Sequence, residues 1–438
     1  MGKFTFKGGV HPEYNKITTD VPIESLPLPK ELHVPVLQHL GKPAKVVVKR
    51  GEVVKRGQII AEADGFISAN IHAPTSGKVK KIWPVLHPVT GINVEAVIIE
   101  PDGEDTWAEG IEEDKNYKDI SPKEIVERVK NAGIVGLGGA TFPTHVKLSP
   151  PPDKPIDTVI INGAECEPYL TADDRIMQER AKDIVEGAFL IKKALSASKV
   201  IIAIEDNKPK AISKVEEAIR GEDWIDIAVT ETKYPEGGEK QLIWAILKRE
   251  VPSGGLPMDV GALVQNVGTT VAIYEAVRYR KPLTERVLTL SGDLPNKRGN
   301  YLVRLGTLFK DVIEFAGGLS GDPYRVIMGG PMMGIAQHSL DVPVIKGTSG
   351  ILVFSRENTD YKEPYPCIRC SRCVDVCPMN LMPLYFVDLI KAKRFEDAKK
   401  IGLLDCIECG SCAYVCPSHI RHVQLIKYGK QELRRLKK

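Results

Sequence analysis

A cysteine motif that occurs twice near the C-terminus is the feature that most constrains this chain. Eight of the nine cysteines follow one another in two copies of C-x2-C-x2-C-x3-C-P, and the ninth, Cys166, stands apart. This is the bacterial ligand pattern for [4Fe–4S] clusters, in which three thiolates of one copy and the last thiolate of the other bind each cluster. We therefore predict one cluster on Cys367, Cys370, Cys373 and Cys416, and a second on Cys377, Cys406, Cys409 and Cys412.

Structural zinc is the alternative metal, because paired C-x2-C motifs also bind Zn²⁺ through four thiolates. A zinc site needs neither the third C-x2-C step nor the closing Cys-Pro, and both occur in each copy. We predict that residues 360–425 form a helical ferredoxin-like domain that conducts electrons. Residues 426–438 form a basic tail, interpreted as a solvated amphipathic helix, with docking on acidic lipid or an acidic protein as the alternative.

Length and composition indicate an ordinary multidomain globular protein. The 438 residues suggest roughly two to four domains. A net charge of +3 and an aromatic content of 6% give no reason to expect a nucleic-acid partner. The best apolar stretch is interrupted by charges, and the N-terminus lacks the apolar core of a signal peptide. We expect a protein that stays in the cytoplasm, free or docked on other proteins.

Three regions precede the cysteines, and together they predict a multidomain α/β protein. Residues 1–105 have short apolar runs between glycine turns, which predicts an all-β domain. They resemble a barrel-sandwich hybrid of the biotinyl/lipoyl type, but the hairpin tip carries no lysine for a prosthetic group. Residues 119–280 alternate helices and strands, which predicts a largely parallel sheet. Residues 281–345 return to β character.

A glycine-rich loop marks a candidate ligand site in the α/β region. The segment from Gly136 to Lys147 reads GLGGATFPTHVK, and its glycines could expose backbone N–H groups to a phosphate. A predicted strand at 158–161 ends in the polar sequence NGAECEP, at the edge where α/β sheets bind ligands. Two further polar segments follow, YPEGGEK at 234–240 and QNVGTT at 265–270.

This set of segments resembles the flavin- and NADH-binding subunit of respiratory complex I. The motifs of that protein are GRGGAGFPTGLKW, NADESEPG, YICGEE and an asparagine turn, in the same order. With its domain order and two C-terminal clusters, the whole chain resembles the RnfC family, which belongs to the Rnf complex, an ion-translocating ferredoxin:NAD oxidoreductase. The resemblance also implies that residues 281–345 are an SLBB-like β-grasp unit.

The resemblance implies a role for individual residues. It implies that the FMN phosphate is bound by Gly136, Gly138, Gly139 and Lys147. It implies that Glu165 and Glu239 are the catalytic carboxylates near the flavin and the nicotinamide. The remaining implied contacts to flavin or nucleotide are Phe142, Asn162, Asn266 and Thr269.

The chain also departs from the complex I motifs. The loop arginine is Leu137, two loop glycines are Thr141 and His145, the aspartate before Glu165 is Ala164, and the first glutamate of the GEE motif is Gly238. These changes leave open a pure iron–sulfur relay whose flavin domain is vestigial. A cobalamin reductase that combines flavin with clusters is the second alternative, since it resembles the same family.

The cofactors implied by the resemblance account for a complete electron path. NADH delivers a hydride, a [4Fe–4S] cluster accepts single electrons, and a non-covalent FMN between them handles both. The implied partners are NADH, the membrane subunits of the same complex and a ferredoxin-type or cluster-bearing electron partner. The implied location is the cytoplasmic side of the inner membrane, with the chain bound peripherally. Cys166 is interpreted as a small buried thiol.

Overall fold

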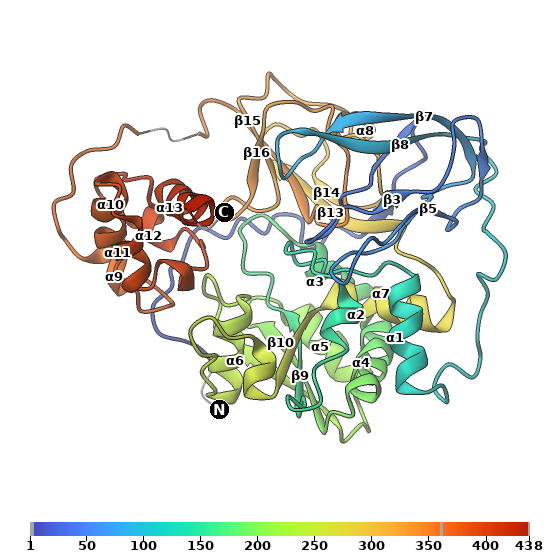
Figure 1. Cartoon of the computed structure of the whole chain (residues 1–438), viewed down its shortest axis with the longest axis horizontal. Coiled ribbons are helices and arrows are strands. Elements are labelled where there is room, and N and C mark those ends of the chain that lie inside the picture. Colours follow the sequence, from blue (N-terminus) through green and yellow to red (C-terminus); the bar gives the residue numbers. More distant parts are fainter. Residues whose placement is uncertain (1–3, 360–361, 437–438) are drawn as a thin grey trace.

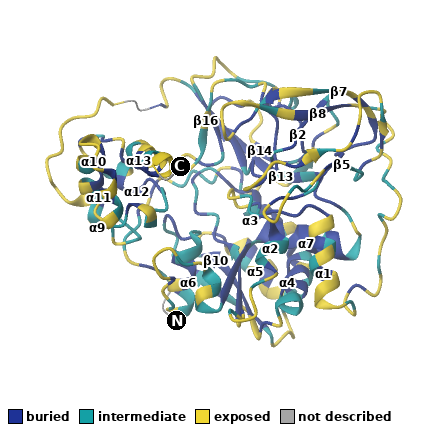
Figure 2. Cartoon of the chain, viewed as in Figure 1, coloured by how far each residue is buried: buried dark blue, intermediate teal, exposed yellow. Residues whose placement is uncertain are grey.

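The computed structural model describes residues 4–359 and 362–436, which form four packed units (Figure 1). A β domain and a second sheet lie beside each other, above the layered α/β domain in this view. A helical C-terminal domain lies to one side and is connected to the rest by an extended segment. Residues 362–372 of this segment and of the first cysteine motif are exposed (Figure 2).

The β domain consists of two small sheets around one apolar core. The first sheet has the order β2-β8-β7-β4, and the second has the order β3-β5-β6. Buried valine, isoleucine and alanine side chains from both sheets share this core. The strands are β2 (Leu32–Pro35), β3 (Lys45–Val46), β4 (Val53–Val54), β5 (Ile59–Glu62), β6 (Ile71–His72), β7 (Gly77–Leu86) and β8 (Asn93–Pro101).

The α/β domain is built on a parallel four-stranded sheet of order β11-β10-β9-β12. Its strands are β9 (Thr158–Gly163), β10 (Lys199–Glu205), β11 (Ile225–Thr230) and β12 (Ala262–Asn266). Alternate residues face opposite sides, so Val159 and Ile161 join the core under one helical layer, whereas Ile160 packs with the helix on the other face.

The helices of this domain cover both faces of the sheet. Residues from α1 (Pro122–Asn131), α4 (Ala181–Leu195), α5 (Pro209–Ala218) and α7 (Val267–Arg278) share one core, and α6 (Glu239–Leu247) packs on the opposite face. Ser121 caps α1, because its side chain accepts a hydrogen bond from the amide of Glu124. Shorter segments are α2 (Thr144–Lys147), α3 (Ala172–Glu179) and the 3₁₀ turn η1 (Pro257–Val260).

A six-stranded mixed sheet of order β1-β14-β13-β17-β15-β16 forms the third unit. Two of its strands lie outside the predicted range of 281–345: β1 (Ile23–Ser25) pairs in parallel with β14, and β17 (Gly350–Phe354) pairs with β13 and β15. The other elements are β13 (Glu285–Gly292), β14 (Gly299–Arg304), α8 (Phe309–Phe315), β15 (Arg325–Met328) and β16 (Ile335–Gln337).

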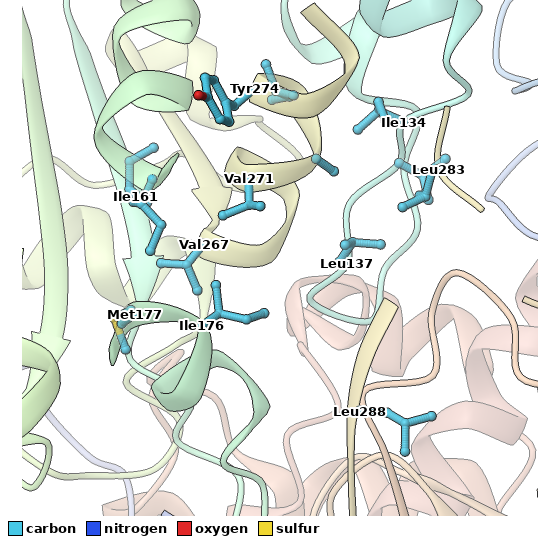
Figure 3. Packing of buried hydrophobic residues seen from close by; sticks show 14 of the residues in the cluster. Ile134, Leu137, Ile161, Ile176, Met177, Val267, Val271, Tyr274, Leu283 and Leu288 are labelled. Atoms are coloured by element: carbon cyan, nitrogen blue, oxygen red, sulfur yellow. The ribbon is translucent and has the colours of Figure 1, made fainter. Parts of the chain in front are cut away.

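The core of this sheet is continuous with that of the α/β domain. Ile134 and Leu137 of the glycine-loop region belong to the same buried cluster as Leu283 and Leu288 (Figure 3). The glycine loop is therefore supported by apolar packing from both units, which fixes its position relative to the sheet edge.

The C-terminal domain is a small helical unit with its own apolar core. Its elements are α9 (Arg372–Asp375), α10 (Pro383–Lys391), α11 (Phe395–Lys400), the 3₁₀ turn η2 (Leu403–Asp405), α12 (Ser411–Tyr414) and α13 (His422–Leu436). The predicted solvated tail at 426–438 is part of α13 as far as residue 436, and 437–438 lie outside the described residues. Ile426 and Leu433 are buried against α10 and α11, so one face of the tail belongs to the core.

Residues 4–26 run outside the β domain, which was predicted to span residues 1–105. Phe4 and Val10 form isolated bridges with Thr230 and Tyr234 of the α/β domain. The amide of Gly9 donates to the carbonyl of Val376 in the C-terminal domain over 2.8 Å. With β1 in the third sheet, this N-terminal strap (residues 4–26) thus contacts three of the four units.

Candidate functional site: a flavin site joined to two cysteine cavities

Two cavities in the C-terminal domain are each lined by four cysteines. Cys377, Cys406, Cys409 and Cys412 line the first cavity, which we name the inner cavity. The other four line the second, named the outer cavity: Cys367, Cys370, Cys373 and Cys416. The structure therefore brings the eight predicted ligands together in the two predicted sets. The assignment of each thiolate to a particular cluster stays a prediction.

The turns around the cysteines repeat the same backbone conformations in both motifs. Arg369 and Glu408 occupy corresponding positions and both have positive φ, +53° and +59°. Their amides donate to the sulfur atoms of Cys367 and Cys406, each over 3.4 Å. Amide donors stabilise thiolates, as a cluster ligand requires, and four sulfurs converge on each cavity, so these residues fit two [4Fe–4S] clusters.

Lys430 supports the inner cavity from the segment predicted to be a solvated tail. Its amine donates to the carbonyl of Cys406 over 2.6 Å and forms an ion pair with Glu408 at 2.7 Å. Sequence reasoning missed this residue, because the pattern of charges in α13 does not show which lysine faces the domain core.

The inner cavity lies against the α/β domain, and the outer cavity opens toward solvent. Tyr234 is 1% exposed, and its hydroxyl donates to the carbonyl of Cys409 over 2.7 Å. Tyr234, Cys409, Cys166 and Val10 form one apolar cluster. In the outer set, by contrast, Cys367 and its neighbour Cys370 are exposed. The two cavities therefore have different environments: the inner one packs against the α/β domain, and the outer one includes two exposed cysteines.

The glycine loop is held in a closed turn at the start of α7. The amide of Gly136 donates to the carbonyl of Phe142 over 2.9 Å, and the amide of Leu137 donates to the hydroxyl of Thr269 over 2.8 Å. Gly138 and Gly139 remain exposed, and Gly139 has a φ of +105°. The loop therefore presents free glycine backbone beside the N-terminus of a 12-residue helix, where N–H groups and the helix dipole favour an anion.

The two predicted asparagines lie side by side at the ends of strands β9 and β12. Asn162 and Asn266 are partners in the sheet register. Asn162 donates to the carbonyl of Gly237 over 2.9 Å, while Asn266 caps α7 by accepting from the amide of Thr269 and donates to Asp173 over 2.7 Å. Both side chains are thus fixed at the sheet edge that the glycine loop borders.

Lys147 and Glu239 form an ion pair at 2.9 Å across this edge. The Lys147 amine also donates to the carbonyl of Val264 over 2.7 Å. Both side chains are partly exposed, at 27% and 40%, so a ligand can reach them. A phosphate that binds Lys147 must compete with Glu239 or displace it, which sequence reasoning did not reveal.

Glu165 and Glu167 form a pair of carboxyls whose affinity for protons is raised. The Glu165 carboxylate accepts from the amides of Asp173 and Asp174 at the start of α3, while burial raises its pKa to about 7. Glu167 accepts from the amides of Met332 and Met333, and burial raises its pKa to about 7 as well. Both carboxyls can therefore hold or release a proton near neutral pH.

Lys16 connects the backbone of the segment that carries these glutamates to the N-terminal strap. Its amine donates to the carbonyls of Glu165, Glu167 and Leu170, at 2.6 to 2.8 Å. Lys16, Asp173 and Glu167 were not among the predicted site residues. No local pattern around Lys16 could have indicated it, since its partners lie about 150 positions later in the chain.

The arrangement fits a flavin mononucleotide. Exposed glycine amides at a helix N-terminus suit its phosphate, fixed amide side chains at the sheet edge suit its polar ring atoms, and a Cβ placed at Gly139 would meet no described atom within 4 Å. The predicted residues Gly136, Gly138, Gly139, Asn162 and Asn266 are brought together. Phe142 is half-buried beside them. The role of each residue stays a prediction.

Four protein families match successive parts of the chain. The RnfC barrel sandwich hybrid domain matches residues 4–104, the Nuo51 FMN-binding domain matches 129–275, the SLBB domain matches 287–336, and the 4Fe-4S dicluster domain matches 366–420. The predicted multidomain fold class is confirmed, as are FMN and the two [4Fe–4S] clusters as cofactors. Among the described residues, every helix is too short or too polar to cross a membrane.

Solved structures share the fold over part of the chain. An air-oxidized NAD+-reducing [NiFe]-hydrogenase has a TM-score of 0.50 and 23% identity, covering 63% of this chain and 54% of that chain. The H2-reduced form has a TM-score of 0.50 and 20% identity, covering 72% and 61%. At this identity the likeness concerns the fold alone.

Curated relatives match almost the full length. The C subunit of the proton-translocating ferredoxin:NAD(+) oxidoreductase complex of Clostridium ljungdahlii is 51% identical, covering 98% of this chain and 94% of its own. The C subunit of the Na(+)-translocating complex of Acetobacterium woodii is 44% identical, covering 92% and 90%. The C subunit of the ion-translocating oxidoreductase complex of Rhodobacter capsulatus is 43% identical, covering 99% and 84%. The predicted resemblance is confirmed, and the chain belongs to the RnfC family of the ion-translocating oxidoreductase complexes.

Proposed function

We propose that this protein passes electrons between NAD(H), a bound FMN and two [4Fe–4S] clusters, as part of an ion-translocating ferredoxin:NAD oxidoreductase. The single observation that carries the proposal is the contact of Tyr234 with Cys409, because it joins the loop beside the flavin site to the inner cysteine cavity. The flavin, when bound, converts a two-electron hydride transfer into single-electron steps.

The residues of the α/β domain bind and orient the flavin and hold protons beside it. Gly138 and Gly139 offer backbone amides to the phosphate, and Lys147 supplies positive charge once it releases Glu239. Glu165 lies at the same edge and can hold a proton at neutral pH, because its pKa is raised to about 7. Apolar residues around Cys166 exclude water on the side of the clusters.

The order of the clusters follows from their surroundings. Cys377, Cys406, Cys409 and Cys412 would hold the cluster that is nearer to the flavin in the electron path, because their cavity lies at the domain contact. The cysteines of the outer cavity would hold the cluster that serves a partner, because Cys367 and Cys370 are exposed. The partner is a ferredoxin-type or cluster-bearing protein, and the membrane subunits of the complex bind this chain at the cytoplasmic face of the inner membrane.

Cofactor analysis and an NADH titration test the proposal. Anaerobic purification should give about eight irons, about eight sulfides and about one FMN per chain, as two [4Fe–4S] clusters and one flavin require. NADH should bleach the flavin and produce cluster EPR signals. A full iron content without flavin after FMN reconstitution, together with no response to NADH, would contradict the proposal and favour an iron–sulfur relay.

Two matched cysteine variants test the order of the clusters. With Cys406→Ser, NADH should still reduce the flavin, but reduction of the remaining cluster should slow at least tenfold, because the inner cluster is lost. With Cys367→Ser, reduction of the remaining cluster by NADH should keep the wild-type rate. The reverse result would reverse the proposed order.

A further inference from the structure

Glu236 is a fully buried carboxyl in the loop between β11 and α6. The residue is 0% exposed, and neither side-chain oxygen has a hydrogen-bond partner within residues 4–359 and 362–436. Burying a charged carboxylate without partners costs far more than burying the neutral acid. Because it is buried and has no partner among the described residues, the Glu236 carboxyl is therefore held in its protonated form.

Charged groups from three elements face Glu236. Glu205 lies at the end of β10, Glu231 and Lys233 belong to the same loop, and Lys248 follows α6. Burial, followed by the charge of Glu205, raises the pKa of Glu236 to about 9, although the two lysines act in the opposite direction. Neither lysine forms a hydrogen bond with its oxygens; the Lys233 amine donates instead to the carbonyl of Phe6 over 2.9 Å.

Glu205 forms an ion pair with a lysine. It is 0% exposed, and Lys208 forms an ion pair with it at 2.6 Å while also donating to the carbonyl of Ala164. Lys208 is therefore engaged by Glu205 and by the end of β9. The second oxygen of Glu205 has no partner in the described part of the chain, so one oxygen of Glu205 and both oxygens of Glu236 lack a donor there.

The loop that holds Glu236 contacts both redox sites. Two residues earlier, Tyr234 donates to the carbonyl of Cys409 beside the inner cavity. One residue later, the amide of Gly237 donates to the sulfur of Cys166 over 3.3 Å, and its carbonyl accepts from Asn162 at the flavin edge. Glu236 is therefore held by a loop that contacts both the flavin edge and the inner cavity, and its carboxyl is buried in a water-poor region, where charges interact strongly.

We propose that Glu236 is a buried protonation site whose neutral form sustains the reduction potentials of the flavin and the inner cluster. When Glu236 loses its proton to solvent, the carboxylate left behind repels an added electron and lowers both potentials. Conversely, an electron added to the inner cluster favours the acid, so up to one proton moves from water onto Glu236 per electron. This inference rests on the proposed function, because it requires both redox groups to be bound.

Potentiometric titrations of the complete holoprotein from neutral to strongly alkaline pH test the proposal. Absorbance would follow the flavin and EPR the clusters, in wild type and in Glu236→Gln, which is neutral and of the same shape. The flavin potential falls with pH in both proteins, because flavin reduction itself takes up a proton. Beyond this shared slope, we expect equal potentials at neutral pH and an additional fall of the flavin and inner-cluster potentials in the wild type as the pH passes about 9. Glu236→Gln should lack this additional fall. The control Glu231→Gln removes a neighbouring but partly exposed carboxyl and should follow the wild type.

Coinciding pH curves for wild type and Glu236→Gln would overturn the proposal. If that variant still binds flavin and a full complement of iron and is reduced by NADH, only the role of Glu236 fails. A wild type that binds no flavin or ignores NADH would instead contradict the proposed function.

Thermal unfolding gives a readout that does not depend on the flavin. An acid whose pKa is raised from 4.5 to about 9 on folding loses stability as the pH rises between these values, because the unfolded chain ionises first. Glu236→Gln should therefore gain apparent Tm relative to wild type as the pH rises through this window. A constant Tm difference across the window would show that Glu236 is ionised in the folded protein and overturn the proposal.

Discussion

Gly139 shows at the scale of one residue how the glycine loop depends on backbone conformation. Its φ is +105°, and that of Gly221, in a loop of the α/β domain away from the site, is +92°. In neither case would an added Cβ meet a described atom within 4 Å. Alanine at either position therefore introduces similar backbone strain, of about 1–2 kcal/mol.

We expect Gly139→Ala to weaken FMN binding at least tenfold, whereas Gly221→Ala should bind FMN as the wild type does. The physical reason is that, of these two glycines, only Gly139 belongs to the proposed phosphate site, where an added β-carbon would occupy the site or change the backbone that lines it. FMN fluorescence titrations measure the affinity, and thermal unfolding checks that both variants lose similar stability. Equal FMN affinity in the two variants would show that Gly139 is not part of the flavin site.

Helix α13 shows how an element predicted to be solvated became part of a core. Leu433 is 2% exposed and packs among Phe386, Ile390 and Phe395, whereas Leu436 at the end of the helix is 62% exposed. Leu433→Ala should lower the free energy of unfolding of the C-terminal domain by about 2–5 kcal/mol. Leu436→Ala should change it by less than about 0.5 kcal/mol.

Denaturant titrations followed by cluster absorbance would measure both changes in the holoprotein. The destabilised Leu433→Ala protein should lose its clusters at a lower denaturant concentration than Leu436→Ala. Equal midpoints would mean that α13 is not part of the cooperative core of the domain.

Local sequence patterns predicted the helices and strands well, but they did not predict contacts between segments that are far apart in the chain. The spacing of the cysteines was enough to pair Cys377 with the second motif, and the glycine loop indicated a phosphate site. Strand β1 could not be foreseen in the third sheet, because three residues carry too little pattern to reveal a partner strand that lies more than 270 positions later in the chain. The buried state of Glu236 likewise depends on β10, and the sequence YPEGGEK does not disclose it.

For the whole molecule, the contact of Tyr234 with Cys409 should control electron transfer between domains. Tyr301 offers a matched control, because it is equally buried and its hydroxyl donates to the carbonyl of Lys297 over 3.0 Å within the third unit. Replacing either tyrosine by phenylalanine should cost about 0.5–1.5 kcal/mol of stability. Only Tyr234→Phe should slow cluster reduction, because of these two hydroxyls only that of Tyr234 joins the loop between β11 and α6 to the inner cavity.

Rapid mixing with NADH separates slower cluster reduction from the loss of stability that both variants share. Flavin bleaching should keep its wild-type rate in both variants, and cluster reduction should slow several-fold in Tyr234→Phe alone. Equal cluster reduction in Tyr234→Phe and Tyr301→Phe would place the electron path elsewhere.

The N-terminal strap gives the biosynthesis of this protein a fixed order. Gly9 binds Val376, and a Cβ at Gly8 would lie only 2.9 Å from the carbonyl oxygen of Cys377, so the strap passes close to the inner cavity. These glycines are translated before their partners, which lie more than 360 positions later in the chain. A polypeptide that ended before the cysteine motifs would keep its flavin-binding region but lack the thiolates that bind the clusters. The strap contact can therefore form only after the first cysteine motif has been translated.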